Sequence, residues 1–455
     1  MCIFLPLEMN AFLNGSTQHP MKQLFVVLCF CIISHQLSAQ KWQQVGPKMS
    51  YAALTLLNDT TNNQLIAGGS FDSIGSMYVS RIARWNGTAW DTFGQGLSNG
   101  QVRALAMYNN QLYAGGTFNQ SGTKTVNFFT RWNGSSWDSL EFTTGNCNVQ
   151  DIKEYKGNLY ICGGFPDAGG LTVNNIASFN GTNWTALLGG TNGLVYSMAV
   201  YNNELYIGGA FDTVSGIPAK HVAKWDGIGW SPVGTGTDKT VYSLHVYNGL
   251  LIAGGYFNNA GGNPANYIAA WNDSIWTPLG SGMNNTVFTV YSAFGKLYTG
   301  GAFTLAGGNL ARSIAEWDGS TWSGMDDGLN NFVQTISVYN NKLYAGGIFT
   351  QSGTRQVNYI ARFDTLITGI SESEIAIFDI YPNPLTSNAT INYAENLNHG
   401  EITIFNLAGV EVRKIKNYRG GRLNIHRDDL PAGTYLLRLS DDGSTVVVRR
   451  LLVLD

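Results

Sequence analysis

The chain has 455 residues and a formal net charge of −3, with 13% charged and 44% hydrophobic residues. This composition excludes a disordered acidic or basic chain, because such chains are rich in charge and poor in aromatic residues. The 55 glycines and the 12% of aromatic residues instead favour many short strands joined by tight turns. Beyond the N-terminus no run of about 18 apolar residues occurs, so we expect no transmembrane span.

The first element in chain order is an export signal. A lysine is followed by an apolar run that ends at residue 33 and is too short to span a bilayer. Small residues come next, so the pattern predicts a signal peptide over residues 21–39 that is cleaved between Ala39 and Gln40. Residues 1–20 fit neither a signal peptide nor a domain, and we expect translation to begin after them. The alternative is that the apolar run forms a buried N-terminal strand.

Seven copies of one pattern follow the leader. The segment Leu-Tyr-Ala-Gly-Gly-Thr-Phe at residues 112–118 recurs with spacings of 46 or 47 residues, its closing phenylalanine being Phe71, Phe118, Phe165, Phe211, Phe257, Phe303 and Phe349. Periods of about 40–50 residues are typical of propeller blades when each repeat has four strand-like segments. We therefore expect an all-β chain in which residues 40–365 form a seven-bladed β-propeller.

One repeat shows how a blade is built. Residues 195–201 alternate as a strand does, two asparagines form a turn, and residues 205–211 form the second strand. A glycine-bearing loop leads to a third strand that ends at Trp225. An Asp-Gly hairpin then leads to a fourth strand at Trp230.

Trp42 predicts how the ring closes. Residues 42–46 match the fourth-strand pattern, yet no repeat precedes them. The seventh repeat, conversely, stops shortly after Phe363 without its own fourth strand. We therefore expect the N-terminal strand to be the outer strand of the last blade, which would leave the ring without a long free edge.

The double glycine of each repeat has a structural explanation that we favour. Glycine in the second strand allows close packing of neighbouring backbones, whereas a phosphate cradle needs a lysine and a helix start as well. Two cysteines remain after the leader, Cys147 and Cys162. The hairpin register places Cys162 opposite about Asp151, roughly 13 Å along the strand from Cys147, so we expect two free structural thiols rather than a disulfide.

The apolar segment, the double glycine and the spaced aromatic residues resemble those of kelch-type propellers. The match extends over residues 42–365 and is nearest to the kelch motif at Leu343-Tyr344-Ala345-Gly346-Gly347. The hairpins carry Trp-Asn-Gly where kelch repeats usually carry Tyr-Asp. The resemblance therefore implies the fold and gives little information on function.

After Phe363 the period ends. Residues 366–376 have the composition of a linker. Residues 377–455 then show six short strand patterns separated by turns, at 389–393, 401–405, 410–415, 423–426, 435–439 and 446–453. Six strands in so short a segment predict a small Ig-like β-sandwich.

Several short motifs stand in order within this segment. They are Tyr381-Pro382-Asn383-Pro384, Gly409 at the end of Ile-Phe-Asn-Leu-Ala-Gly, Gly433 within Leu-Pro-Ala-Gly-Thr-Tyr, and the pair Arg449 and Arg450 in the closing strand. Together they resemble the type A sorting domain of the type IX secretion system of Bacteroidota. The resemblance implies export to the periplasm, passage across the outer membrane by the type IX machinery, removal of the domain, and release or surface attachment. The alternative is an ordinary Ig-like accessory domain.

The sequence carries no recognisable catalytic or metal-binding motif. The four histidines after the leader stand apart from one another, and no Gly-x-Ser-x-Gly elbow or alternating-aspartate calcium loop occurs. We therefore expect neither a cofactor nor a metal. Acidic and basic residues nearly balance, so no basic field predicts a nucleic-acid partner.

Two functional hypotheses remain, and both depend on the loops that join one blade's outer strand to the next blade's inner strand. These loops are rich in Asn, Gly and Ser, and their ligand-binding candidates are Asn99, Asp238, Asn285 and Asp327. The first hypothesis, which we favour, is a non-catalytic binding or surface-structural protein whose extracellular ligand is a glycan or a matrix protein. The second is a glycan-active hydrolase or lyase, which would need two carboxylates at a fixed separation.

Overall fold

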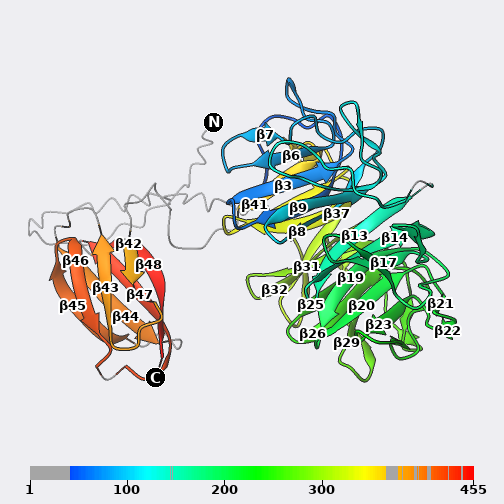
Figure 1. Ribbon diagram of the computed structural model, residues 1–455. Helices are drawn as coiled ribbons and strands as arrows, with labels where there is room; N and C mark the ends of the chain where they lie inside the picture. Colours follow the sequence, from blue (N-terminus) through cyan, green and yellow to red (C-terminus); the bar gives the residue numbers. More distant parts are fainter. Residues whose placement is uncertain are drawn as a thin grey trace, which may run out of the picture. The chain divides into compact units, whose positions relative to one another are not determined.

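The computed structural model describes residues 41–143, 145, 147–364, 378–381, 383–393, 397, 399–406, 411–428, 430–441 and 444–454. Every regular element in these residues is a strand, which confirms the all-β prediction (Figure 1). In the same part of the chain no apolar helix of membrane-spanning length occurs. The expected signal peptide, its cleavage point at Ala39 and Gln40, and the expected linker over residues 366–376 lie outside the described residues.

The repeats form one antiparallel sheet each. The first strands are β2 (Ala53–Asp59), β8 (Val102–Tyr108), β13 (Asn148–Tyr155), β19 (Val195–Tyr201), β25 (Val241–Tyr247), β31 (Val287–Ala293) and β37 (Val333–Tyr339). The second strands are β3 (Gln64–Gly69), β9 (Gln111–Gly116), β14 (Asn158–Gly164), β20 (Glu204–Gly209), β26 (Leu250–Gly255), β32 (Lys296–Gly301) and β38 (Lys342–Gly347). Each second strand pairs with the first strand of its own repeat.

The outer strands of each sheet carry the tryptophans. The third strands are β6 (Ile82–Trp85), β12 (Phe129–Arg131), β17 (Ile176–Phe179), β23 (Val222–Trp225), β29 (Ile268–Trp271), β35 (Ile314–Trp317) and β41 (Ile360–Asp364). The fourth strands are β7 (Trp90–Thr92), β18 (Trp184–Ala186), β24 (Trp230–Pro232), β30 (Trp276–Pro278) and β36 (Trp322–Gly324). In the second repeat a single bridge between Trp132 and Trp137 stands in place of the fourth strand.

The last sheet takes its fourth strand from the N-terminus. Strand β1 (Lys41–Gln44) pairs antiparallel with β41, so that Trp42 lies opposite Phe363. This is the pairing that the Trp42 pattern predicts. The indole N–H of Trp42 donates to the carbonyl of Met325, 3.3 Å away, just after β36 of the preceding sheet.

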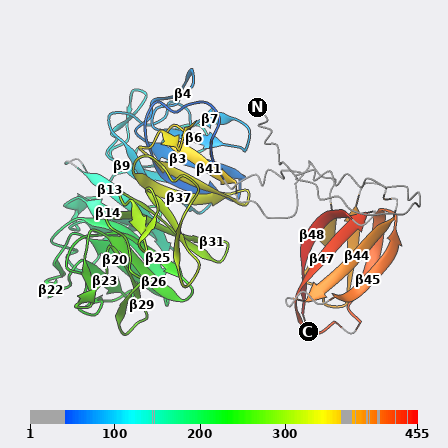
Figure 2. The same cartoon turned by 180° about the vertical axis from the view of Figure 1, so that it is seen from behind.

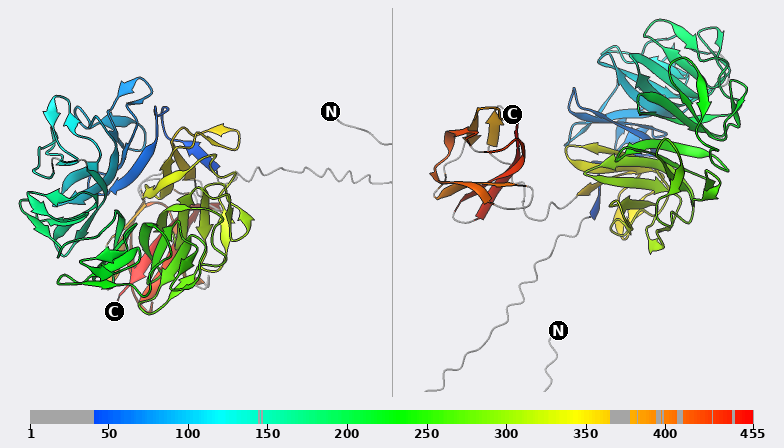
Figure 3. Two further views of the ribbon diagram at one scale, coloured as in Figure 1. Left: turned by 90° about the vertical axis from the view of Figure 1, so that its right-hand side faces the viewer. Right: turned by 90° about the horizontal axis from the view of Figure 1, so that it is seen from below.

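The same indole contact joins every sheet to the one before it. Trp90, for example, donates to the carbonyl of Val45, which follows β1. The remaining contacts of this kind are Trp137 to Phe93, Trp184 to Glu141, Trp230 to Leu187, Trp276 to Val233 and Trp322 to Leu279. The first strands also lie beside one another in chain order, with β37 beside β2 (Figure 3).

The double glycine provides the space that this packing needs. A Cβ at Gly254 would lie 2.5 Å from a methyl carbon of Val287 in the next sheet, and one at Gly255 would lie 2.2 Å from the carbonyl oxygen of Thr240. A side chain at the first position of this sheet would therefore push the next sheet away, whereas the third sheet accommodates the small side chain of Cys162 at the equivalent position. This supports the packing explanation of the motif.

A two-stranded hairpin follows each second strand, where the sequence predicts only a loop. The hairpins are β4 (Ser73–Ile74) with β5 (Met77–Tyr78), β10 (Gln120–Ser121) with β11 (Lys124–Thr125), β15 (Asp167–Ala168) with β16 (Leu171–Thr172), β21 (Thr213–Val214) with β22 (Ile217–Pro218), β27 (Asn259–Ala260) with β28 (Asn263–Pro264), β33 (Leu305–Ala306) with β34 (Asn309–Leu310), and β39 (Gln351–Ser352) with β40 (Arg355–Gln356). Each is only two residues long on either side.

The C-terminal segment has one strand more than the six expected, because β42 (Phe378–Tyr381) precedes them. Strands β42, β43 (Asn388–Tyr393) and β46 (Gly421–His426) form one sheet. Strands β45 (Glu411–Tyr418), β44 (Gly400–Asn406), β47 (Gly433–Asp441) and β48 (Ser444–Val453) form the other, side by side in Figure 2. One hydrophobic cluster joins both sheets and includes Ile391, Ile404 and Leu437.

Candidate functional site

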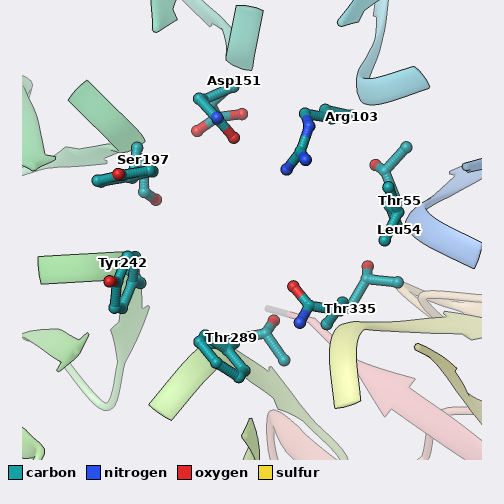
Figure 4. Close-up of a pocket in the computed structure, with 12 residues that line it drawn as sticks. Leu54, Thr55, Arg103, Asp151, Ser197, Tyr242, Thr289 and Thr335 are labelled. Atoms are coloured by element: carbon teal, nitrogen blue, oxygen red, sulfur yellow. The ribbon is translucent and has the colours of Figure 1, made fainter. Parts of the chain in front are cut away.

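A β-bulge near the start of each first strand builds the central cavity. In β8, for example, Val102 pairs with Gly116 and Ala104 with Gly115, which leaves Arg103 as the extra residue. The equivalent residues in the seven strands are Leu54, Arg103, Gln150, Tyr196, Tyr242, Phe288 and Gln334. All seven line one cavity of about 320 Å³ (Figure 4). Bulges of this kind redirect side chains and are common next to functional sites.

In four repeats the residue after the bulge links neighbouring sheets through its side chain. The hydroxyl of Ser197 accepts a hydrogen bond from the backbone N–H of Leu244, and the hydroxyl of Thr335 accepts one from Leu56. Asp151 stands at this position in the third sheet, where most other repeats carry serine or threonine. Asp151 therefore occupies a position that links two sheets, and its titratable carboxyl group also lines the cavity.

The carboxylate of Asp151 is occupied by backbone donors. Its Oδ1 accepts from the N–H of Ile152 and its Oδ2 from the N–H of Met198, both at 2.8 Å. Burial raises the pKa of Asp151, while the positive charge of Lys153 and the two hydrogen bonds act in the opposite direction. Among the residues that line the cavity, Asp151 is the one acid.

Arg103 is the charged group that points toward the open centre (Figure 4). Its Nη2 donates to the side-chain oxygen of Gln101 at 2.6 Å, while its Nε is buried without a hydrogen-bond partner in the described part of the chain. Burial lowers the pKa of Arg103, yet a guanidinium remains charged near neutral pH. The cavity therefore contains a partly desolvated positive charge.

The opposite side of the cavity is aromatic. The ring centroids of Tyr196 and Tyr242 are 4.9 Å apart, and those of Tyr242 and Phe288 are 5.7 Å apart. Phe332, in the loop before β37, continues the series at 5.6 Å from Phe288. We call Tyr196, Tyr242 and Phe288, which line the cavity, the aromatic arc. It faces a cavity whose other bulged residues include Arg103 and the two glutamines.

Two of the predicted loop candidates hold the small hairpins in place. The Oδ1 of Asp238 accepts from the backbone N–H groups of Asn258 and Asn259 at 2.9 and 3.0 Å. The same contact recurs at the equivalent loop positions, Asn192, Asn284 and Asn330. Asn99, with φ of 60°, donates from its amide to the side-chain oxygen of Gln120 at 2.7 Å.

These contacts also determine the acidity of Asp238. Burial favours the neutral acid, but hydrogen bonds from the backbone and side chain of Asn259 and from the backbone of Asn258 prevail and lower the pKa of Asp238. A carboxyl group of this kind is ionised at neutral pH and cannot act as a general acid there.

The other two loop candidates differ from each other. The Oδ1 of Asn285 accepts from the backbone N–H of Thr286 at 2.7 Å. The side chain of Asp327 is 53% exposed, with one oxygen 3.6 Å from Arg355. Its neighbour Asp326 forms an ion pair with Arg355 and accepts from the backbone N–H of Trp42 at 3.2 Å. A ligand-binding role for the four loop residues stays a prediction.

The role of the cavity residues Arg103 and Asp151 was not predicted from the sequence. Their signal was present as a departure from the repeat, because Arg103 is the one charged residue among the seven bulged positions and Asp151 the one charged residue among the positions that follow. The bulge itself has no sequence signature, so this strand position looks like an ordinary alternating core position. Both residues therefore stand out as departures from the pattern when the seven repeats are aligned.

Both cysteines of the propeller region are buried and free, as predicted. Cys162 pairs with Asp151 in the register of β13 and β14. Burial raises the pKa of the Cys147 thiol to about 12, and burial likewise raises that of Cys162. With raised pKa values both thiols stay protonated at neutral pH, and a protonated thiol is a poor nucleophile. Within the described residues no group of three His, Cys, Asp or Glu side chains could hold a metal ion.

The predicted sorting motif packs against the last strand of the chain. The side-chain oxygen of Asn383 accepts from the backbone N–H of Leu452 at 2.9 Å, and Leu385 forms a parallel bridge with Val453. Gly433 begins β47 and lies opposite Val453. Tyr381 ends β42, and Arg449 and Arg450 lie within β48. Pro382 and Gly409 lie outside the described residues, and Pro384 follows Asn383 in the turn before β43.

Two family models match the chain. The secretion system C-terminal sorting domain matches residues 379–454. A β-propeller domain of unknown function, DUF5122, matches residues 340–365. The chain therefore carries a type IX sorting domain and a β-propeller, and it is exported by type IX secretion to the cell surface or outside the cell. A search of the curated proteins finds no match.

Two solved structures are similar in fold. One is described as the extracellular domain of a hybrid two-component system of B. thetaiotaomicron, with 10% identity and a TM-score of 0.48; the match covers 91% of this chain and 57% of that one. The other is a fungal alcohol oxidase of the AA5 family in complex with copper, with 12% identity and a TM-score of 0.45; the match covers 91% of this chain and 99% of that one. Likeness at this level says nothing about the ligand or chemistry of this chain.

Proposed function

We propose that the protein is a non-catalytic binding protein of the bacterial surface or exterior, with a glycan or a matrix protein as its ligand. Its repeats are the blades of one kelch-like, seven-bladed propeller that β1 closes. A signal peptide over residues 21–39 directs it to the periplasm of a Bacteroidota cell. Its Ig-like sorting domain over residues 377–455 then engages the type IX machinery, and residues 366–376 link the two domains.

Contacts that cross from the last sheet to the first support closure of the ring. The phenol of Tyr339 donates to the carbonyl of Asn63 at 2.9 Å, as Tyr108 donates to Gly157 between the second and third sheets. The indole of Trp90 bonds Val45, just after β1, in the way the other fourth-strand indoles bond the preceding sheet.

The composition of the central cavity supports binding rather than hydrolysis. Glycoside hydrolysis uses two carboxyl groups on either side of the scissile bond. The residues that line the described cavity include one carboxyl group, that of Asp151, and both of its oxygens accept backbone hydrogen bonds. The lining instead combines three aromatic rings with a larger number of polar side chains, which suits a polar ligand that has an apolar face, such as a sugar. This lining is the observation on which the proposal rests.

A binding screen combined with a turnover assay tests the proposal. The purified chain is applied to arrays of glycans and extracellular matrix proteins, and each binder is then incubated with the protein and analysed by mass spectrometry. We expect at least one saturable binder that remains chemically unchanged. Turnover that disappears in Asp238→Asn or Asp327→Asn would favour the enzyme, and absence of any binder would contradict the proposal.

A further inference from the structure

Arg103 is a positive charge without a counter-ion. No carboxylate lies within ion-pair distance of it among the described residues, and its Nε has no hydrogen-bond partner there. Asp151 lines the same cavity, but its oxygens are taken by backbone donors and its charged neighbour is Lys153 on the same strand. A partly buried guanidinium is costly to leave unpaired, because desolvation removes hydrogen bonds that water would supply. This arrangement therefore favours binding of an anion.

The geometry of a guanidinium favours a carboxylate. Its planar N–H donors match the two oxygens of a carboxylate in a bidentate pair. Nε is buried and Nη2 donates one of its two hydrogens to Gln101, so Nη1 and the second hydrogen of Nη2 are the donors available to such a pair. One arginine supplies the charge for one carboxylate.

The aromatic arc and the two glutamines indicate what carries the carboxylate. The arc offers apolar ring surface at Tyr196, Tyr242 and Phe288, against which the C–H face of a sugar ring can be removed from water. Gln150 and Gln334 also line the cavity, and amides both donate to and accept from hydroxyl groups. A volume of about 320 Å³ lies at the lower end of the range for small-ligand pockets.

We infer that the central cavity binds an acidic sugar, with the carboxylate paired to Arg103 and the sugar ring against the aromatic arc. The inference rests on the proposed binding function and specifies the ligand class of that function. The sugar is a single residue, free or at the end of a glycan.

Matched pairs of acidic and neutral sugars test the inference. The purified chain is titrated calorimetrically with glucuronate against glucose and with galacturonate against galactose. Wild-type protein should bind one acid at least about tenfold more tightly than its neutral partner, and Arg103→Gln should lose this preference. Arg103→Lys keeps the charge without the bidentate geometry and should retain part of it. Arg84→Gln is the control, because Arg84 pairs with Asp91 away from the cavity, and it should bind as wild type does.

Three outcomes would overturn the inference. They are neutral sugars that bind as tightly as the acids, an acid preference that survives Arg103→Gln in a protein with a wild-type circular dichroism spectrum, and tighter binding of phenylacetate, a carboxylate without a sugar, than of either uronate. A ligand from the array screen that binds Arg103→Gln and wild type equally would leave the binding function standing without this site. Absence of ligands in both experiments would contradict the binding function itself.

Discussion

Trp42 and Phe363 lie opposite each other across the β1–β41 pair, although 321 positions separate them in the chain, and their ring centroids are 4.9 Å apart. Trp42 has no exposed surface, and Phe363 is 2% exposed. The first strand of the described chain is therefore part of the core of the last sheet. Its loss would remove a buried tryptophan and uncover the edge of β41 at the same time.

Removal of residues 40–47 tests this relationship. The truncation should cost about 3–5 kcal/mol from the buried tryptophan alone. It also leaves β41 with an unpaired edge, which favours association between copies. Thermal melting and size-exclusion chromatography measure both effects, with a chain that starts at Gln40 as the control. A truncated protein that melts with the control and stays monomeric would contradict the assignment of β1.

The packing role of the double glycine predicts a clear contrast between two alanine variants. Gly254→Ala places a Cβ 2.5 Å from Val287, and overpacking of this kind costs about 1–3 kcal/mol. Gly229→Ala meets nothing within 4 Å and is the control. Urea denaturation should show a lower midpoint for the first variant and an unchanged midpoint for the second. Equal midpoints would mean that the sheets can move apart without cost.

His245 should contribute to acid sensitivity. Burial lowers the pKa of His245 from 6.5 to about 4, with a smaller contribution from the charge of Lys153. Between these two pH values the unfolded chain binds a proton that the native state does not, so the free energy of unfolding falls as the pH is lowered through this window. The contribution is fully present above pH 6.5.

The variant His245→Gln isolates this effect from other titrating groups such as Asp151, whose raised pKa acts in the opposite direction as the pH rises. Between pH 7 and pH 4 wild type should lose about 3 kcal/mol more than the variant. Denaturation at several pH values measures the difference. Parallel stability profiles would show that His245 is protonated freely in the native state.

The hydrogen bonds that Asp238 accepts from the hairpin predict which substitutions at this position preserve stability. Asp238→Asn keeps an oxygen acceptor, as Asn192, Asn284 and Asn330 do at the equivalent positions, and should leave stability almost unchanged. Asp238→Ala leaves two backbone N–H groups without this partner and should cost about 1 kcal/mol. The melting temperatures of wild type and the two variants, measured under the same conditions, test this prediction. Equal losses in both variants would mean that the charge, and not the hydrogen bonds, holds the hairpin.

The repeat shows which features a sequence reveals and which it conceals. Strands of six or seven residues with an alternating pattern, and hairpins marked by Asn-Gly or Asp-Gly, were predictable because each leaves a periodic or compositional signal. The hairpin of β27 and β28 has two residues per strand, too few for any alternation. The bulge that turns Arg103 into the cavity arises from the pairing of two strands, and the sequence of neither strand carries a pattern that predicts it. For the same reason Asp238 looked like a ligand candidate, since its acceptor role depends on a hairpin about 20 residues further along.

We propose that the propeller folds by itself and that residues 377–455, here called the tail, direct export. Deletion of residues 377–455 tests this proposal most directly. The hydrophobic clusters of the described propeller residues contain no side chain from the tail, and the tail has a cluster of its own. The deletion should therefore leave the melting temperature of the propeller nearly unchanged while it traps the protein in the periplasm. Cell fractionation of the deletion strain measures where the truncated chain accumulates. Intact-mass measurement of the wild-type secreted protein shows whether the tail has been removed, and thermal melting of the purified propeller measures its stability. We expect periplasmic retention of the truncated chain and a secreted wild-type form that lacks the tail. Normal surface delivery without residues 377–455, or a secreted protein that still ends at Asp455, would contradict the role of this segment as a cleavable sorting domain.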